Sequence, residues 1–407
     1  MFEKILLRKG ASAPEIDLGL LAEALLFYQD VHIIMDPGTA LHLEFAIGYA
    51  NLKRLADDGH ASFSFFRSFF GASSSKQNGI AINTLVQFQS AGKTPNTKWS
   101  SEDDLASVLA RKGYETKKAN SAARSIIKLA PPELMKLSGK SIDVIQMANE
   151  DLRDPQYMNA AARVFLQDKT GQQIPPNWNF KAHEIGKGEF IVVTNYDFPL
   201  LSAQYQKLNQ LPANELLTPS SVLAEVLEAR ADVVFASKYM AESVTTPTRS
   251  AIIQNKFELI GNLRRQHSQA DIELFQEIHL NGNSLRTAIN SGQRTFEEFL
   301  DLLDKTRKFK SWLKGVKPEA GLLKEYHDAV IRETWLERLP NKSSRFTVMT
   351  GAGAIIDYFV TGGAATVGAL ALGAADTFLV DRMLKGWRPN QFVEKNLTPF
   401  LQSENGH

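Results

Sequence analysis

The chain of 407 residues contains no cysteine. This absence excludes disulfide bonds, thiolate nucleophiles, iron–sulfur clusters and every zinc site with a cysteine ligand. Neither sign of charge dominates, since 46 Lys and Arg residues stand against 45 Asp and Glu residues. The protein as a whole therefore has no electrostatic attraction to nucleic acid or to an anionic membrane, and only a local patch could supply one.

A long apolar run is missing from the N-terminus. Charged residues lie on both sides of the short apolar run Ile5–Leu7, whereas a secretory signal needs roughly 7–15 uninterrupted apolar residues. We therefore expect a cytoplasmic protein. The composition is that of an ordinary globular chain, with 43% hydrophobic and 22% charged residues, which excludes a collagen-like or wholly disordered protein.

Strand-like and helix-like patterns alternate along the first hundred residues. Val31–Met35 has the pattern of a buried strand and is followed by an Asp-Pro-Gly turn and a helix over about 40–55. A second buried strand, 190–194, is expected to join the same sheet. These patterns predict an α/β domain over 1–215, a mixed sheet with flanking helices and a helical insertion at about 101–180.

The rest of the chain has helical patterns, and we predict a helical domain over 216–345. A Gly/Ala-rich helical hairpin and C-terminal tail over 346–407 are expected to pack on it. The charge-free run in this last segment divides into two arms at paired glycines, each too short to cross roughly 30 Å of hydrocarbon. We therefore expect no stable membrane insertion, although a membrane-active protein that uses 346–380 remains an alternative.

Acidic residues at strand ends are the best candidates for catalysis. Asp36 follows the strand that ends at Met35, and Asp197 follows the strand 190–194. In open α/β sheets ligands bind beyond the carboxyl ends of the strands. Together with Asp232, these carboxylates could hold Mg²⁺ for a phosphoesterase or nuclease reaction. The alternative is that Asp36 and Asp197 cap the structures that follow them.

A local excess of positive charge occurs in 105–140, which carries eight basic residues and two acidic ones. The pattern outlines two helices joined by a short turn at Gly113. This shape could place its second helix on nucleic acid, or the charges could simply form the solvated face of a helical hairpin. The candidate nucleic-acid contacts are Lys117, Lys118, Arg124 and Lys128.

Familiar catalytic motifs are missing. Gly92-Lys93-Thr94 lacks the first glycine of a phosphate-binding loop, since position 87 is Gln. No His-Glu-x-x-His pair and no Gly-x-Ser-x-Gly elbow occurs. The sequence thus favours a binding or regulatory protein without catalytic activity and without a cofactor, acting on an unidentified protein partner or, through 105–140, on nucleic acid.

Overall fold

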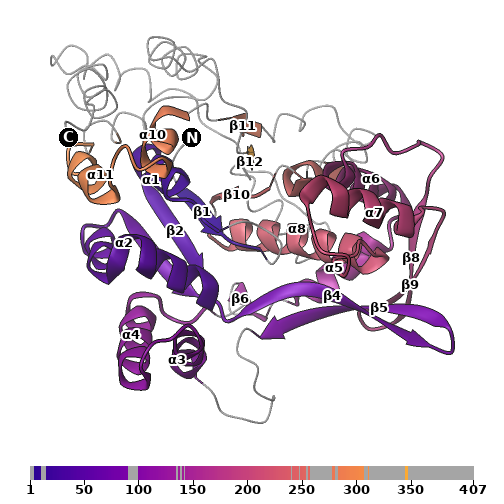
Figure 1. Ribbon diagram of the computed structural model, residues 1–407, viewed down its shortest axis with the longest axis horizontal. Helices are drawn as coiled ribbons and strands as arrows, with labels where there is room; N and C mark the ends of the chain where they lie inside the picture. Colours follow the sequence, from indigo (N-terminus) through magenta and orange to yellow (C-terminus); the bar gives the residue numbers. More distant parts are fainter. Residues whose placement is uncertain are drawn as a thin grey trace.

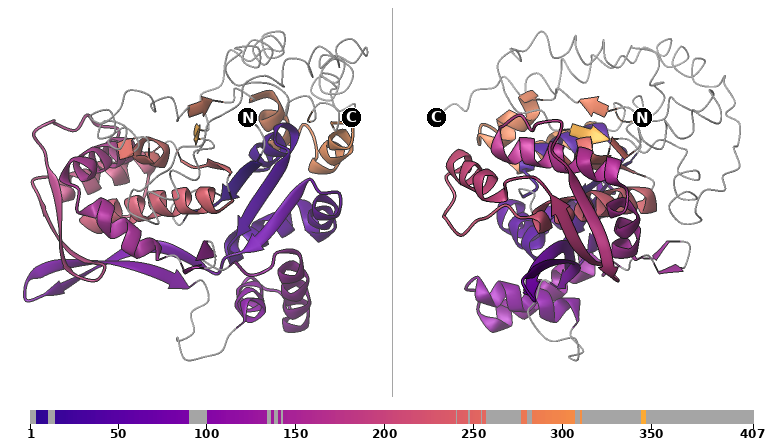
Figure 2. Two further views of the ribbon diagram at one scale, coloured as in Figure 1. Left: turned by 180° about the vertical axis from the view of Figure 1, so that it is seen from behind. Right: turned by 90° about the vertical axis from the view of Figure 1, so that its right-hand side faces the viewer.

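The structure is a computed structural model, and Figures 1 and 2 show its arrangement. It describes residues 4–10, 15–89, 100–133, 136–137, 140–141, 143–239, 241–246, 248–253, 255–256, 277–279, 283–306, 310 and 344–346.

The first sheet has a parallel core. It has six strands in the order β11-β12-β10-β1-β2-β3, and the four strands from β10 to β3 are mutually parallel. The strand bounds are β1 Lys4–Arg8, β2 Asp30–Met35, β3 Ala61–Phe65, β10 Glu242–Val244, β11 Glu277–His279 and β12 Ser344–Phe346. From β1 the sheet continues to β2 and β3 on one side and to β10 on the other. The strand order therefore reverses between β1 and β10, and the carboxyl ends of these two strands form the topological switch point of the sheet.

Helices cover both faces of this sheet. On one face, Ile5, Leu7 and Ile33 share a core with α1 (Leu18–Phe27) and α2 (Pro37–Asp57). On the other face, Leu6 and Ile34 belong to a second core that includes α8 (Pro219–Tyr239). The alternation follows from the two-residue period of a strand, which sends successive side chains to opposite faces. The N-terminal half is therefore α/β, as the sequence predicts.

The strand 190–194 lies in a separate sheet. Four antiparallel strands in the order β4-β5-β9-β8 form this sheet, with α5, α6 and α8 packed against it. The prediction that 190–194 joins the sheet of Val31–Met35 is wrong, because β9 pairs with the long hairpin β4–β5 instead. The bounds are β4 Ser68–Gln77, β5 Ile80–Gln89, β8 Phe180–Gly186, β9 Glu189–Thr194, α5 Val144–Leu152, α6 Pro155–Thr170 and α7 Phe198–Asn209.

A helical hairpin stands below α2 (Figures 1 and 2). Its helices are α3 (Ser101–Arg111) and α4 (Thr116–Leu129). Ser100 and Asp103 form a capping box at the start of α3, and Gly113 takes a φ of 95° in the turn between the helices, where a side chain would be strained. The predicted helices of 101–180 are thus present, together with the short strands β6 (Lys136–Leu137) and β7 (Lys140–Ser141).

The chain after residue 216 is not exclusively helical in the part that the structure describes. The helices α8, α10 (Asn283–Asn290) and α11 (Phe296–Leu303) lie there, but the short strands β10, β11 and β12 extend the first sheet. A capping box between Thr295 and Glu298 starts α11. The Gly/Ala-rich segment lies outside the described residues. Among those described, no helix is long and apolar enough to cross a membrane.

Candidate functional site

The basic residues of α4 lie opposite its buried face. Ala119, Ala123 and Ile126 are buried in the core shared with α2, α3 and β3. At about 100° per residue, Lys117, Arg124 and Lys128 fall within one narrow stripe on the other side of the helix. Lys118 lies on the flank of the stripe, and all four of these basic side chains are exposed.

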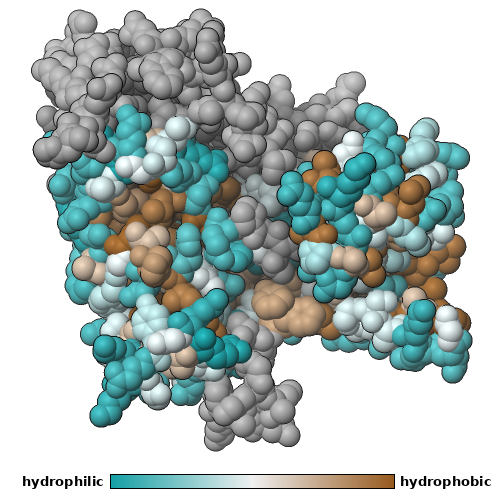
Figure 3. All heavy atoms as spheres, viewed as in Figure 1, coloured by the Kyte–Doolittle hydropathy of each residue, from teal (hydrophilic) through white to brown (hydrophobic). Residues whose placement is uncertain are grey.

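The acidic residues nearest this stripe lie outside α4, at its N-cap Glu115 and in the first turn of α3. The helix α4 contains no acidic residue. Within the described part of the chain, Arg124 pairs with Glu102 at 3.8 Å between Nε and Oε2, while Lys117, Lys118 and Lys128 form no ion pair. On the face shown in Figure 3, the surface over α3 and α4 is largely hydrophilic. The arrangement presents positive charge to solvent and suits an extended polyanion.

The three predicted catalytic carboxylates have separate roles. Asp36 caps α2 by accepting from the backbone N–H of Thr39 at 2.6 Å, and Asp197 caps α7 by accepting from Leu200 at 3.0 Å. These two residues follow strands of different sheets. Their side chains and that of Asp232 do not form a group with ligand atoms within 4.8 Å of one another. The structure therefore lends no geometric support to a shared Mg²⁺ site, whose existence remains a prediction.

Asp232 belongs instead to a buried ion cluster at the switch point of the first sheet. Arg8, the last residue of β1, donates from Nε to Asp232 Oδ1 at 3.0 Å and from Nη2 to Glu228 Oε2 at 2.5 Å. Arg249 donates from Nε to Glu225 Oε1 at 2.9 Å. Both guanidinium groups and all three carboxylates are almost completely buried.

Attraction between the buried arginines and carboxylates keeps the arginines of this ion cluster protonated. Burial lowers the pKa of Arg249, but the carboxylates of Glu225, Glu228 and Asp232 outweigh that effect, so the pKa lies above its ordinary value. The second oxygen of Asp232 accepts from the hydroxyl of Thr245 at 2.7 Å. Because the two arginines are already neutralised by three carboxylates, the cluster is unsuited to binding an anionic ligand. Its clearest role is to hold α8 against the carboxyl end of β1.

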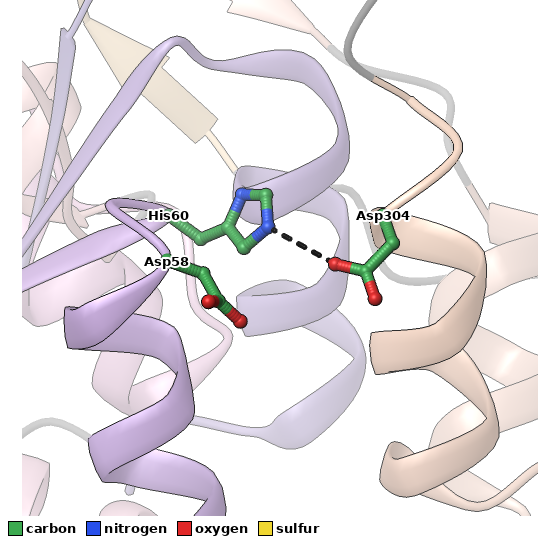
Figure 4. Close-up of side chains that lie close together, drawn as sticks. All are labelled: Asp58, His60 and Asp304. Atoms are coloured by element: carbon green, nitrogen blue, oxygen red, sulfur yellow. Dashed lines mark ion pairs between the residues drawn. The ribbon is translucent and has the colours of Figure 1, made fainter.

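A second group of potential metal ligands joins α2 to α11. Asp58, His60 and Asp304 place one ligand atom each within 4.8 Å of the others (Figure 4). His60 Nε2 lies 3.7 Å from Asp304 Oδ1, and burial together with the charge of Lys310 lowers the pKa of His60. Arg54 pairs with both carboxylates, at 3.8 Å to Asp58 and 2.9 Å to Asp304. A cation would have to displace this guanidinium, so the group is best described as an ion network between two helices.

Sequence reasoning missed most of the buried ion cluster. A signal was present, because Glu225, Glu228 and Asp232 recur at i, i+3 and i+7 in the mainly apolar helix α8, and charges at this spacing share one helix face. Their partners Arg8 and Arg249 come from distant parts of the chain, and no local pattern identifies them.

Comparison with known proteins gives no information about the role of the basic helix α4. No protein-family model matches the chain, and no curated protein and no solved structure matches it either.

Proposed function

We propose that this protein is cytoplasmic and that it acts by binding nucleic acid through the exposed face of α4. The observation that supports the proposal most directly is the stripe of Lys117, Arg124 and Lys128 on a helix without acidic residues. A binding function also agrees with the class that the sequence favours. Duplex DNA is the form we propose first, because a single exposed helix fits its major groove.

The dimensions of the stripe suit a phosphate backbone. Lys117 and Lys128 are separated by about 17 Å along the helix axis, at roughly 1.5 Å per residue. Phosphates follow one another at about 3.4 Å of axis per strand, so the stripe can reach several of them. With three or four phosphates neutralised, the logarithm of the binding constant should fall with the logarithm of salt concentration with a slope of about −2.7 to −3.6.

The double variant Lys117→Glu, Lys118→Glu should bind duplex DNA far more weakly than the wild-type protein. Replacing two attractive contacts by two repulsive ones should lower the affinity at 50 mM salt by about tenfold to a hundredfold and make its salt dependence shallower. Fluorescence anisotropy of a labelled duplex, titrated with full-length protein at several salt concentrations, measures both quantities.

A matched control is the double variant Lys181→Glu, Lys207→Glu. Both of these lysines are exposed and lie in β8 and α7, outside the hairpin, and the change in net charge is the same. We expect this control to bind within about twofold to threefold of wild type. Equal losses in the two double variants, or no binding of wild type at low salt, would overturn the proposal. Preference for single-stranded RNA over the duplex would reassign the form of nucleic acid.

A further inference from the structure

His32 is a buried imidazole on β2, the strand beside the edge strand β3 of the first sheet. It lies on β2, on the same face as Leu6 and Ile34, and its ring is stacked on that of Tyr239 at the end of α8, with 4.0 Å between the ring centroids. Only 7% of the residue is exposed. A histidine in this position needs partners for both ring nitrogens, because an unsatisfied buried polar atom is costly.

Two serines of the neighbouring strand supply these partners. Ser62 pairs with His32 in the register of β2 and β3, and its Oγ lies 2.8 Å from His32 Nδ1. Ser64, two residues further along the same face, has its Oγ 3.0 Å from His32 Nε2. The two hydroxyls differ in access to solvent, since Ser62 is exposed and Ser64 is buried.

The hydrogen bonds continue beyond Ser64 to a carboxylate. Ser64 Oγ lies 3.4 Å from the hydroxyl of Tyr239, and that hydroxyl donates to Oε2 of Glu133. Lys238 forms an ion pair with the other carboxylate oxygen of Glu133. A chain of hydrogen bonds therefore connects an exposed serine hydroxyl to a carboxylate through a histidine.

The carboxylate determines the direction of every bond in this chain. Ionised Glu133 can only accept, so the hydroxyl of Tyr239 donates to it and is free to accept from Ser64. Ser64 then accepts from Nε2–H of His32, which leaves the lone pair on Nδ1. The hydroxyl of Ser62 must donate to that lone pair, which is the arrangement in which an imidazole can take the proton of a nucleophilic serine.

We propose that Ser62 is a nucleophile for acyl transfer from carboxylic esters, with His32 as its general base and Ser64, Tyr239 and Glu133 as positioning residues. Ser62 Oγ attacks the carbonyl carbon while its proton passes to His32 Nδ1. The ester C–O bond then breaks, and the leaving alkoxide takes that proton. Water attacks the acyl-serine in the second half of the reaction, which releases a carboxylic acid and restores the hydroxyl of Ser62.

The surroundings of His32 limit the kinds of substrate that the site can cleave. Burial, with added effects of Lys4 and Lys238, lowers the pKa of His32 to about 4, so the ring is neutral at neutral pH and its lone pair is available. A base of such a low pKa removes protons less effectively than one near neutrality. We therefore expect reaction with activated esters, which have good leaving groups, rather than with amides.

The test uses a fluorophosphonate reagent, which forms a stable bond with activated serines. Full-length wild-type protein should be labelled at Ser62, as located by peptide mass spectrometry, and should hydrolyse an activated aryl ester. Ser62→Ala should abolish both reactions. His32→Gln should slow them by about a hundredfold or more, the usual contribution of a general base.

Two further variants separate catalysis from a merely structural role. Tyr239→Phe keeps the ring that stacks on His32 but removes the hydroxyl, so it should lower kcat for the ester by several-fold with KM unchanged. Ser75→Ala removes an exposed serine of the β4–β5 hairpin and should change nothing. Unlabelled wild-type protein, or equal labelling of Ser62 in the wild type and in a folded His32→Gln variant, would refute the proposal. Ser62→Ala should still bind DNA like the wild type, so this result is independent of the proposed nucleic-acid function.

Discussion

Replacing Arg249 with methionine should lower the free energy of unfolding by about 3–5 kcal/mol. Arg249 is 1% exposed, and its guanidinium contacts Glu225, Glu228 and Asp232. Methionine fills much of the volume but leaves the three buried carboxylates with Arg8 as the one arginine that pairs with them among the described residues. An uncompensated buried charge is far more costly than a broken pair on the surface, because neither water nor a counterion can reach it.

Arg54→Met provides the matched control for this substitution. Arg54 also contacts three carboxylates, those of Asp58, Asp301 and Asp304, but the side chains of these partners are 45%, 70% and 52% exposed. Water and salt screen such pairs, so the loss should be at most about 1 kcal/mol. Urea unfolding of wild type and both variants, followed by circular dichroism, measures the difference. Similar losses for Arg54→Met and Arg249→Met would show that burial does not control the energetics of the ion cluster. Adding Glu225→Gln to Arg249→Met should recover part of the lost stability.

Lowering the pH through the range from about 6.5 to about 4 should remove about 3 kcal/mol of stability through His32 alone. In the folded protein the pKa of His32 is lowered to about 4 from the ordinary value of 6.5. Between these values the unfolded chain binds a proton that the folded chain does not, so stability rises with pH and is complete above about 6.5. The size follows from a difference of about 2.5 pKa units at roughly 1.4 kcal/mol per unit.

The variant His32→Gln isolates this contribution. Glutamine can still hydrogen-bond to Ser62 and Ser64 but does not titrate, so its stability should depend less steeply on pH between about 6.5 and 4. Carboxylates elsewhere in the protein titrate in both proteins and cancel in the comparison. Thermal unfolding at a series of pH values provides the measurement. Parallel pH profiles for the two proteins would mean that His32 is protonated as easily in the folded state as in the unfolded chain.

Local spacing was enough to predict the hairpin and its basic stripe. The buried positions Ala119, Ala123 and Ile126 repeat with the period of an α-helix, so the positions between them had to face solvent. The Gly113 turn and the acidic cap of α3 are also local signals. For this reason the candidate nucleic-acid residues could be named from the sequence, and the structure places them on one exposed surface.

The partners of strands and buried charges could not be predicted in this way. The strand 190–194 has the composition of any buried strand, and its pairing with β5 rather than β2 depends on the long β4–β5 hairpin and on the helices that pack against it. The same applies to Asp36 and Asp197, whose position at the ends of strands was predicted correctly but whose strands belong to different sheets.

The sequence by itself determined the α/β character of the N-terminal half, the absence of cysteine chemistry and the charged face of α4. Each of these depends on composition or on contacts between residues close in the chain. The tertiary structure alone decided that Arg8 meets Asp232, 224 positions away, and that Ser62 meets His32. Such contacts form where burial makes an unpaired charge or polar group costly, and which groups become buried together depends on the packing of the whole chain.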